Sequence, residues 1–427
     1  MASVTIEPGR LDGIVDAPPS KSLMHRAVLL SALAGGKSQI APVTLSEDIR
    51  ATLSAVRALG ARWTLNGDAL TVMGGARGAR AGEGLALIDC AESGSTLRFL
   101  VPIALALGRG ARFVGRGRLN QRPMEPYERI CRAQGIAYER REGPVLDLRV
   151  EGQLKSGAFE LPGDVSSQFV SGLLMALPLL RDDSTIRLTS ELESRGYIGL
   201  TLDAMKAFGV EVQRPNERLF KVPGKQRYRA RDYHVEGDYS QAAVFLCAAA
   251  LGHGARVRGL PQNTLQGDQA VLSYLMRMGA QVWERDGISG ACSGELHGAV
   301  IDGRDCPDIL PILALAGALA EGETRIVNAA RLRLKESDRI AATCEALSAL
   351  GARAKETEDG MVVEGVKRLR GGVTVGCAGD HRIAMLLAVA ALHADAPVTL
   401  TGVECLNKSY PNFFKDFQAL GGIVYAG

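Results

Sequence analysis

The sequence has few aromatic residues, a small net charge and no long hydrophobic run. Aromatic side chains make up 5% of its 427 residues, and they are not interleaved with basic residues as in proteins that bind single-stranded nucleic acids. The 50 basic and 47 acidic residues leave a formal charge of +3, so a local cluster of cations would have to hold any anionic ligand. The longest apolar stretch, around residues 309–320, is too short to span a bilayer, and residues 1–10 lack the pattern of a signal peptide. We therefore expect a cytoplasmic, folded protein with no nucleic-acid or membrane partner.

Motifs for metals and nucleotides are missing as well. The eight cysteines form no CxxC pair and the six histidines form no HxxxH or HExxH pattern, so we expect reduced thiols and no metal site. The AGGKS segment at 34–38 has Ser31 where a Walker loop needs its first glycine. GRGRLN at 115–120 lacks the third glycine of a dinucleotide fingerprint. We expect no cofactor.

The sequence does contain a sixfold internal repeat. An Ala/Leu-rich helical run stops near residues 35, 108, 181, 252, 322 and 395, and an amphipathic helix follows it in each repeat. The amphipathic helices end at Gly60, Gly135, Gly209, Gly279, Gly351 and Gly421. Both series advance by about seventy residues per step, which indicates six βαβα-type units. The first helix of each unit should be buried, because it has little polar face, and the second should lie outside. Two groups of three units suit the usual size of a domain.

A turn rich in Ser, Gly, Asp and Pro precedes every inner helix. Such residues cap helix N-termini, where free N–H groups and the helix dipole favour anions. Cations accompany these turns at Lys21, Arg26, Arg98 and the pair His381–Arg382, although a helix dipole disfavours a cation there. We infer that anionic ligands bind at this end of the units.

Further basic residues lie in loops, at Arg122, in the segment RLRLKESDR at 331–339, and at Lys408. Glu336 and Asp338 are interleaved with the cations of the RLRLKESDR segment. Such a segment can bind phosphate through its cations and move protons through its carboxylates.

At these positions the sequence resembles the enolpyruvyl transferases, and within them the 5-enolpyruvylshikimate-3-phosphate synthases. The motifs PPSKSLMHR, SGSTLR, QRPMEP, GDVSSQF, SRGYI, EGDYSQAA, CPDILP, RLKESDRI, GDHRIAM and NKSYP occur in the order of that family and span nearly the whole chain. The resemblance implies an α/β (α+β) fold of two domains with three units each, with inner buried helices and mixed sheets outside. One domain would comprise residues 20–232, and the other, discontinuous domain residues 1–19 with 233–427, with the ligand cleft between them.

The resemblance also implies the reaction, in which the enolpyruvyl group of phosphoenolpyruvate passes to the 5-hydroxyl of shikimate 3-phosphate through a tetrahedral intermediate. Phosphate is released, and the enzyme would act as a monomer. The acid–base residues would be Asp308, Glu336 and Lys21. Shikimate 3-phosphate would be bound by Lys21, Ser22, Arg26, Ser166, Ser167, Gln168, Ser194, Tyr197, Asp308, Arg331 and Lys335. Phosphoenolpyruvate would be bound by Lys21, Gly94, Arg122, Gln168, Arg339, Arg382 and Lys408.

Two positions depart from the pattern that the resemblance implies, and a third bears on inhibition. Glu92 and Arg331 stand where many members have Asn. Glu92 places a carboxylate near a predicted anion site, and Arg331 either contacts the shikimate phosphate or turns away from it. Gly94 is the position at which the family senses glyphosate, which we expect to compete with phosphoenolpyruvate.

Two other interpretations remain open. The sister transferase that acts on UDP-N-acetylglucosamine shares the six-unit architecture, but it usually has a cysteine in the loop that corresponds to GRGRLNQRPMEP, and here Cys131 falls beyond that loop in a helix. A non-enzymatic anion- or RNA-binding repeat protein could use the same basic turns. Its binding should weaken steeply with salt and should tolerate loss of Glu336.

Overall fold

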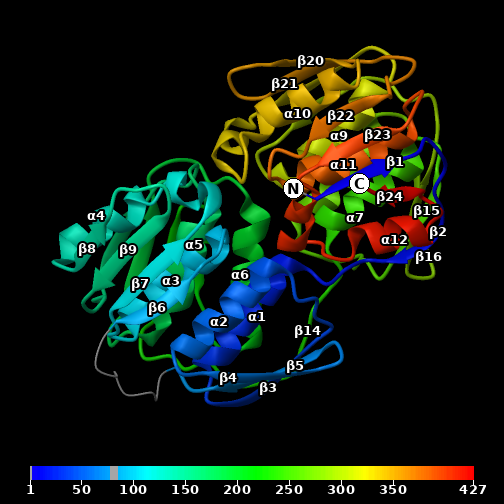
Figure 1. Ribbon diagram of the computed structural model, residues 1–427. Coiled ribbons are helices and arrows are strands. Elements are labelled where there is room, and N and C mark those ends of the chain that lie inside the picture. Colours follow the sequence, from blue (N-terminus) through cyan, green and yellow to red (C-terminus); the bar gives the residue numbers. More distant parts are fainter. Residues whose placement is uncertain (1, 77–84) are drawn as a thin grey trace. The chain divides into compact units, whose positions relative to one another are not determined.

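The computed structural model describes residues 2–76 and 85–427, and the chain divides into two compact units (Figure 1). The continuous unit comprises Pro19–Val235, and the discontinuous unit comprises the residues up to Pro18 together with Glu236–Gly427. The boundaries expected from the sequence, 20 and 232, differ from the observed ones by one residue and by three residues. Each unit has a hydrophobic core made of its own residues.

The described residues form six four-stranded sheets, three in each unit, and every sheet combines one parallel pair with two antiparallel pairs. In the continuous unit the strand orders are β14 (Tyr233–His234), β3 (Gly36–Ala41), β5 (Ala69–Gly74), β4 (Arg62–Asn66); β6 (Ala86–Asp89), β7 (Ala111–Gly115), β9 (Leu146–Glu151), β8 (Ala137–Arg140); and β10 (Ala158–Leu161), β11 (Ser184–Leu188), β13 (Leu219–Val222), β12 (Gln213–Asn216).

In the discontinuous unit the orders are β16 (Gln281–Arg285), β17 (Ile288–Cys292), β15 (Gly254–Arg258), β2 (Asp12–Asp16); β18 (Val300–Asp302), β19 (Glu323–Val327), β21 (Met361–Glu364), β20 (Arg353–Glu356); and β22 (Val373–Gly376), β23 (Val398–Thr401), β1 (Ser3–Ile6), β24 (Val424–Ala426). Two strands from the beginning of the chain therefore complete sheets whose other strands lie after residue 250. The unit is discontinuous because β1 and β2 belong to these sheets.

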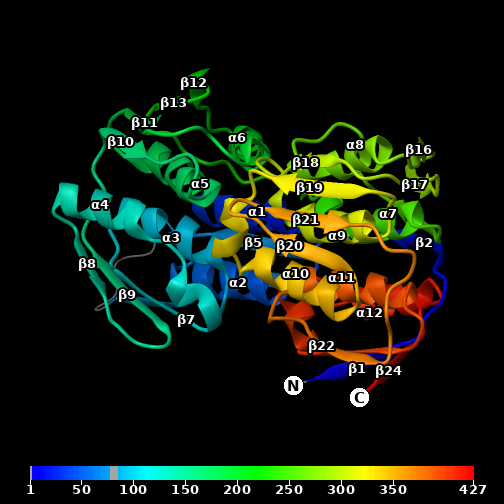
Figure 2. The same ribbon diagram turned by 90° about the horizontal axis from the view of Figure 1, so that it is seen from above.

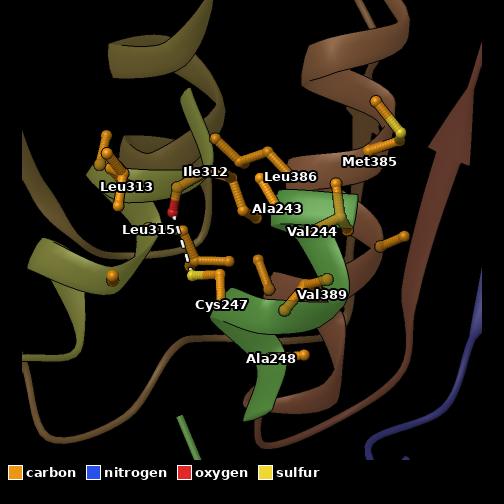
Figure 3. Close-up of a cluster of buried hydrophobic side chains, with 14 of the residues drawn as sticks. Ala243, Val244, Cys247, Ala248, Ile312, Leu313, Leu315, Met385, Leu386 and Val389 are labelled. Atoms are coloured by element: carbon orange, nitrogen blue, oxygen red, sulfur yellow. Dashed lines mark hydrogen bonds between the residues drawn. The ribbon is translucent and has the colours of Figure 1, made fainter. Parts of the chain in front are cut away.

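The six inner helices are buried almost all round, as the sequence predicts. They are α1 (Lys21–Leu33), α3 (Gly94–Ala106), α5 (Ser167–Ala176), α7 (Tyr239–Ala250), α9 (Leu310–Ala318) and α11 (His381–Leu392). In each unit the sheets lie around the inner helices (Figures 1 and 2). Figure 3 shows α7, α9 and α11 meeting through small and branched side chains, with Cys247 Sγ donating a hydrogen bond of 3.3 Å to Ile312 O. Each fully buried Leu in such a core contributes about 1.5–3 kcal/mol.

The six amphipathic helices also form, and each is followed by its predicted glycine. They are α2 (Glu47–Ala58), α4 (Glu125–Gln134), α6 (Arg195–Ala207), α8 (Ala270–Arg277), α10 (Arg339–Ala349) and α12 (Phe413–Ala419). All six glycines have φ between 66° and 102°, a conformation that side chains with a Cβ rarely adopt, so the prediction of glycine C-caps is confirmed. The predicted fold class, with inner helices and outer mixed sheets, is also confirmed.

The structure corrects one part of the helix prediction. The outer helices do not place all their charged residues outside, because Asp48 in the first turn of α2 is 5% exposed and Arg339 at the start of α10 is 1% exposed. Both helices therefore begin inside the protein. None of the helices described by the structure is long and apolar enough to cross a membrane.

Short 3₁₀ helices connect several elements. They are η1 (Gly117–Gln121), η2 (Leu177–Leu179), η3 (Gly267–Gln269), η4 (Pro307–Ile309), η5 (Ala330–Leu334) and η6 (Val403–Lys408). Four of them, η1, η4, η5 and η6, contain or adjoin predicted site residues.

Candidate functional site

The continuous unit brings three predicted residues together at the start of α3. Ser93 caps this helix by accepting a hydrogen bond of 3.2 Å from Thr96 N, and Gly94 is its first residue. A Cβ at Gly94 would lie 2.5 Å from Arg122 Nη1 and 3.4 Å from Gln168 Oε1. The guanidinium and the amide can approach the turn this closely because residue 94 has no side chain. A cation and a helix N-terminus thus meet at one point, which suits a small anion, and the Gln168 amide oxygen lies beside it.

Arg98 fixes the orientation of the Gln168 amide. Arg98 Nη1 donates to Gln168 Oε1 at 2.9 Å, and Nη2 donates to Pro123 O at 2.9 Å. The guanidinium also stacks over the Phe169 ring, 4.8 Å from its centroid. Because arginine can only donate, Gln168 must turn its oxygen toward Arg98, and its Nε2 donates to Ser95 Oγ at 2.9 Å. The sequence predicts that Arg98 faces an anionic ligand, whereas its described hydrogen bonds are to neighbouring residues of the protein.

Arg26 is occupied by the protein in a similar way. It is 3% exposed and donates to Thr201 Oγ1 at 2.8 Å, to Ser22 O at 2.7 Å and to Tyr197 O at 2.9 Å. Burial lowers the pKa of its guanidinium to about 10, and the nearby tyrosines partly oppose this shift. Arg26 therefore links α1 to α6, the helix that carries Tyr197.

The remaining predicted residues of this unit lie at helix starts. Lys21 and Ser22 are the first residues of α1, and Lys21 Nζ forms an ion pair of 2.8 Å with Asp48. Ser166 is the N-cap of α5 and Ser167 its first residue. Ser194 precedes α6 with a left-handed φ of 54°, which leaves the N-terminal amides of that helix at the end of a tight turn.

In the discontinuous unit a single buried arginine holds three carboxylates. Arg339 is 1% exposed; its Nε donates to Asp380 Oδ2 at 2.7 Å, Nη1 to Asp308 Oδ1 at 2.9 Å and Nη2 to Glu336 Oε2 at 2.7 Å. The structure thus brings together the two predicted acid–base residues, Asp308 on η4 and Glu336 just before α10.

Three further cations flank the same two carboxylates. Lys335 Nζ and Arg382 Nη2 each lie 3.5 Å from an Asp308 oxygen, and Lys408 Nζ lies 3.9 Å from Glu336 Oε1. Burial by itself raises the pKa of Asp308, but Lys335, Arg382 and Arg339 outweigh it and hold that pKa well below its usual value. Asp308 is therefore ionised at neutral pH. Burial is also the largest influence on Lys335 and lowers its pKa.

Asp380 is a residue that the sequence analysis missed. It is fully buried, it holds Arg339, and it is the N-cap of α11, where it accepts from Arg382 N at 2.9 Å. It also accepts from Ser337 Oγ at 3.1 Å. The signal was present, because Asp380 precedes the His–Arg pair in the motif GDHRIAM, but a capping role alone would explain it.

The first turn of α7 also supports the site, although no site residue was predicted there. Arg382 donates to the backbone oxygen of Ser240 and, at 2.6 Å, to its Oγ. Gln241 Nε2 donates to both oxygens of Ser409 at 3.2 Å, next to Lys408. The fourth repeat therefore positions two predicted ligands of phosphoenolpyruvate.

The two residues that depart from the family motif have distinct surroundings. Glu92 places its carboxylate against Gly117, at the start of η1, where any Cβ would collide with it. Arg331 Nη2 donates to Arg304 O at 2.6 Å, so this additional cation is at least partly bound to the chain itself.

Six repeats form two units, with cations clustered at several helix starts and a pair of carboxylates in one of them. Comparison with known proteins identifies the class. The model of the EPSP synthase (3-phosphoshikimate 1-carboxyvinyltransferase) family matches residues 6–417. The 3-phosphoshikimate 1-carboxyvinyltransferase of Clostridium beijerinckii is 48% identical over 428 residues, covering 99% of this chain and 98% of the relative. That of Clostridioides difficile is 47% identical over 432 residues with the same coverage.

Solved structures agree with this assignment. EPSP synthase from Acinetobacter baumannii superposes with a TM-score of 0.82 at 27% identity, and each chain is covered in full. The enolpyruvyl transferase NikO from Streptomyces tendae has a TM-score of 0.81 at 20% identity over 100% of this chain and 98% of its own, a likeness of fold alone. The chain belongs to the EPSP synthase family of enzymes.

Proposed function

We propose that this enzyme transfers the enolpyruvyl group of phosphoenolpyruvate to the 5-hydroxyl of shikimate 3-phosphate, with the residues of the two clusters above as its machinery. The observation that carries the assignment of roles is the Asp308–Arg339–Glu336 cluster, in which two carboxylates share one buried arginine and are flanked by three other cations. Two substrates that are both anions require such cations, and an addition–elimination reaction requires a base and an acid.

Asp308 acts on the acceptor. Its ionised carboxylate takes the proton of the 5-hydroxyl as that oxygen attacks C2 of phosphoenolpyruvate. At the same time C3 receives a proton from Glu336, which enters this step as the carboxylic acid and leaves it as the carboxylate, and the tetrahedral intermediate is complete. Lys21 assists proton transfer near the bridging phosphate oxygen.

The second step reverses the proton transfer at C3. Glu336 removes a proton from the new methyl group as the C2–O bond to phosphate breaks, which restores the double bond and releases inorganic phosphate. Arg339, Arg382 and Lys408 stabilise the charge that develops on the leaving phosphate, and each is at most 5% exposed, so its charge is little screened by water.

The remaining predicted residues bind the substrates. Gly94, Arg122 and Gln168 hold phosphoenolpyruvate at the start of α3, and Arg331 and Lys335 serve the acceptor. The shikimate 3-phosphate site is completed by Ser22, Arg26, Ser166, Ser167, Ser194 and Tyr197.

Glyphosate, which carries a carboxylate and a phosphonate, is proposed to compete for the phosphoenolpyruvate position. We further propose a monomeric, cytoplasmic enzyme that needs no metal and binds no nucleic acid.

One observation argues against UDP-N-acetylglucosamine as the acceptor. Cys131 is 1% exposed on α4, and burial raises the pKa of its thiol to about 11, so it is not a mobile, reactive cysteine beside the substrate.

The test is phosphate release from phosphoenolpyruvate by the metal-free protein, with either shikimate 3-phosphate or UDP-N-acetylglucosamine as acceptor. We expect release only with shikimate 3-phosphate, and a loss of at least a hundredfold in Glu336→Gln. Glu323→Gln is the matched control, because Glu323 forms an exposed ion pair with Arg325. Release only with the nucleotide sugar would move the enzyme to the sister activity, and release with neither would favour an anion-binding protein.

A further inference from the structure

An outer helix reaches the beginning of an inner helix in the continuous unit. Asp48, in the first turn of α2, lies 2.8 Å from Nζ of Lys21, the first residue of α1, and their side chains are 7% and 16% exposed. This carboxylate has no part in the mechanism proposed above. Lys21, by contrast, is assigned to the binding of both substrates and to proton transfer.

Helix electrostatics explain why Lys21 needs such a partner. The N-terminus of a helix disfavours a cation, and the first turn of α1 contains no acidic residue. The first turn of α2, where Asp48 lies, favours an anion. Ser46 caps α2 by accepting from Ile49 N, so the backbone around Asp48 is held in place. Asp48 therefore offsets the dipole of α1 from a position that α2 itself stabilises.

One helical turn further on, a chain of buried polar groups connects the same helices. His25 Nδ1 lies 2.8 Å from Thr52 Oγ1, Thr52 Oγ1 lies 2.7 Å from Thr96 Oγ1, and Thr96 Oγ1 donates to Ser93 Oγ at 2.8 Å. All four residues are at most 1% exposed. Burial lowers the pKa of His25 to about 3, so the chain is uncharged. It ends at Ser93, the residue directly before Gly94.

We propose that α2 is a positioning helix for the substrate site: Asp48 holds the Lys21 ammonium, and Thr52 ties α1 to the turn that contains Gly94. This inference rests on the proposed function, because it assumes that Lys21 and the Gly94 turn contact substrate. The Lys21 ammonium and the Gly94 turn of the phosphoenolpyruvate site are then held at a set separation by α2, which touches no substrate itself. Such a preorganised cluster does not have to rearrange when the substrate arrives.

A double-mutant cycle tests whether Asp48 acts through Lys21. Asp48→Asn should lower kcat/KM for phosphoenolpyruvate at least tenfold in the wild type but less than twofold in a Lys21→Met background, since the group it positions is then absent. Asp48→Glu, which keeps the charge, should recover part of the loss. Asp147→Asn is the control, because it breaks another 2.8 Å ion pair of the same unit, with the exposed Arg112. Calorimetric binding of shikimate 3-phosphate gives a second readout for variants with slow turnover.

The polar chain is tested with an isosteric pair. Thr52→Val should raise KM for phosphoenolpyruvate about fivefold or more, and Thr52→Ser, which restores the hydroxyl, should return it to the wild-type value. Thr343→Val is the matched control, because Thr343 occupies the corresponding turn of α10 and its buried hydroxyl has no hydrogen-bond partner among the described residues.

Equal losses from Asp48→Asn in both backgrounds, or no loss in either, would overturn the proposal. So would a Thr52→Ser variant as impaired as Thr52→Val. Phosphate release by the wild-type enzyme is measured in the same assay. If the wild type releases phosphate, the outcomes above contradict only the role of α2. If the wild type releases none, the proposed function itself is contradicted.

Discussion

At the scale of single residues, arginine has different roles according to its burial and its partners. Arg339 donates to three carboxylates in the interior, whereas Arg98 donates to one amide and one backbone oxygen and thereby orients other groups. Arg325 forms only an exposed pair with Glu323. The guanidinium's fixed fork of donors suits the first two roles, which a lysine ammonium would not reproduce.

Gly94→Ala should weaken phosphoenolpyruvate binding without unfolding the protein. The new methyl group would meet Arg122 Nη1 at 2.5 Å and Gln168 Oε1 at 3.4 Å, and both atoms lie at the ends of side chains that can move away. We expect KM for phosphoenolpyruvate to rise about tenfold, which corresponds to about 1.4 kcal/mol of binding free energy. The melting temperature should change little.

Gly143→Ala is the control for that variant, because a Cβ at Gly143 would meet no atom within 4 Å. Steady-state kinetics of both variants measure KM for phosphoenolpyruvate, and thermal unfolding measures their melting temperatures. An unchanged KM in Gly94→Ala would show that Arg122 does not need its present position.

Arg339→Lys should destabilise the discontinuous unit as well as abolish turnover. A lysine cannot donate to Asp380, Asp308 and Glu336 at once, so it leaves buried carboxylates without a partner. We expect the free energy of unfolding to fall by about 3 kcal/mol in urea titrations. Arg325→Lys should change it by less than about 0.5 kcal/mol, because its ion pair is exposed. Equal effects of the two substitutions would contradict this account.

At the scale of elements, helix ends decide where chemistry is placed. The starts of α1, α3, α5, α6, α10 and α11 carry predicted ligands of the substrates. The start of α2 carries Asp48, and the N-cap of α11 is Asp380, which hold two of these ligands. The opposite ends of the helices are closed by glycines and have a structural role. The predicted ligands in each unit therefore lie at one end of its helices.

The C-terminal ends of α7 and α11 meet through two histidines whose protonation should weaken the fold. Leu11 N donates to His253 Nδ1 at 3.1 Å, so the proton of this ring is on Nε2, which lies 3.0 Å from His393 Nε2. Burial, aided by His393 and Arg10, lowers the pKa of His253 to about 4, and burial also lowers the pKa of His393. Neither ring can gain a proton without breaking this arrangement.

Stability should therefore fall as the pH drops below about 6.5. Both histidines bind protons in the unfolded chain near their usual pKa but resist protonation when folded, so their contribution is complete above pH 6.5 and is lost toward pH 4. For His253 alone we expect a loss of about 1–2 kcal/mol between pH 7 and pH 5. Urea titrations at both pH values measure it.

His253→Gln separates this pair from other titrating groups. Glutamine can accept from Leu11 N and donate to His393, but it does not titrate, so the difference between the two pH values should shrink. His234→Gln, at an exposed position of the other unit, should leave the difference unchanged. A pH dependence that is equally steep in all three proteins would rule out the histidine pair as its source.

At the scale of the whole molecule, the two units differ in how much of the chain they need. The continuous unit takes its strands and helices from 19–235 alone, whereas the discontinuous unit needs β1 and β2 from the beginning of the chain. Strand β1 lies between β23 and β24, and β2 forms the edge beside β15. Without them, β24 has no partner strand, and β15 has no partner along one of its edges.

Fragments should reflect this difference. We expect 19–235 to fold alone and to unfold cooperatively in urea, and 236–427 to remain largely unfolded. Moving residues 2–18 behind Gly427 through a short linker should restore folding, since Gly427 N already donates to Ser3 O at 3.0 Å. Circular dichroism and urea titrations of the three fragments test this. Cooperative unfolding of 236–427 alone would show that the N-terminal strands are dispensable.

Local patterns in the sequence were sufficient to predict the repeats, both classes of helix, the glycine caps and the family. Helix periodicity and the φ of a C-capping glycine depend on neighbouring residues, so Gly60 and its five counterparts could be placed without a structure. Two predicted clusters of ligands also lie together in the structure: Gly94, Arg122 and Gln168 in one unit, and Asp308, Glu336 and Arg339 in the other.

Only the tertiary structure could reveal which residues hold these ligands in place. Asp48 and Asp380 are far in sequence from Lys21 and Arg339, and each looks like an ordinary residue of a helix N-terminus until the packing of α2 on α1 and of α10 on α11 brings the charges together. The place of β1 and β2 in sheets completed after residue 250 likewise depends on pairing across the chain. The sequence by itself determined the elements and the chemical types at the site, because these follow from short-range propensity and residue chemistry. The long-range contacts that orient them follow from packing, which no local pattern encodes.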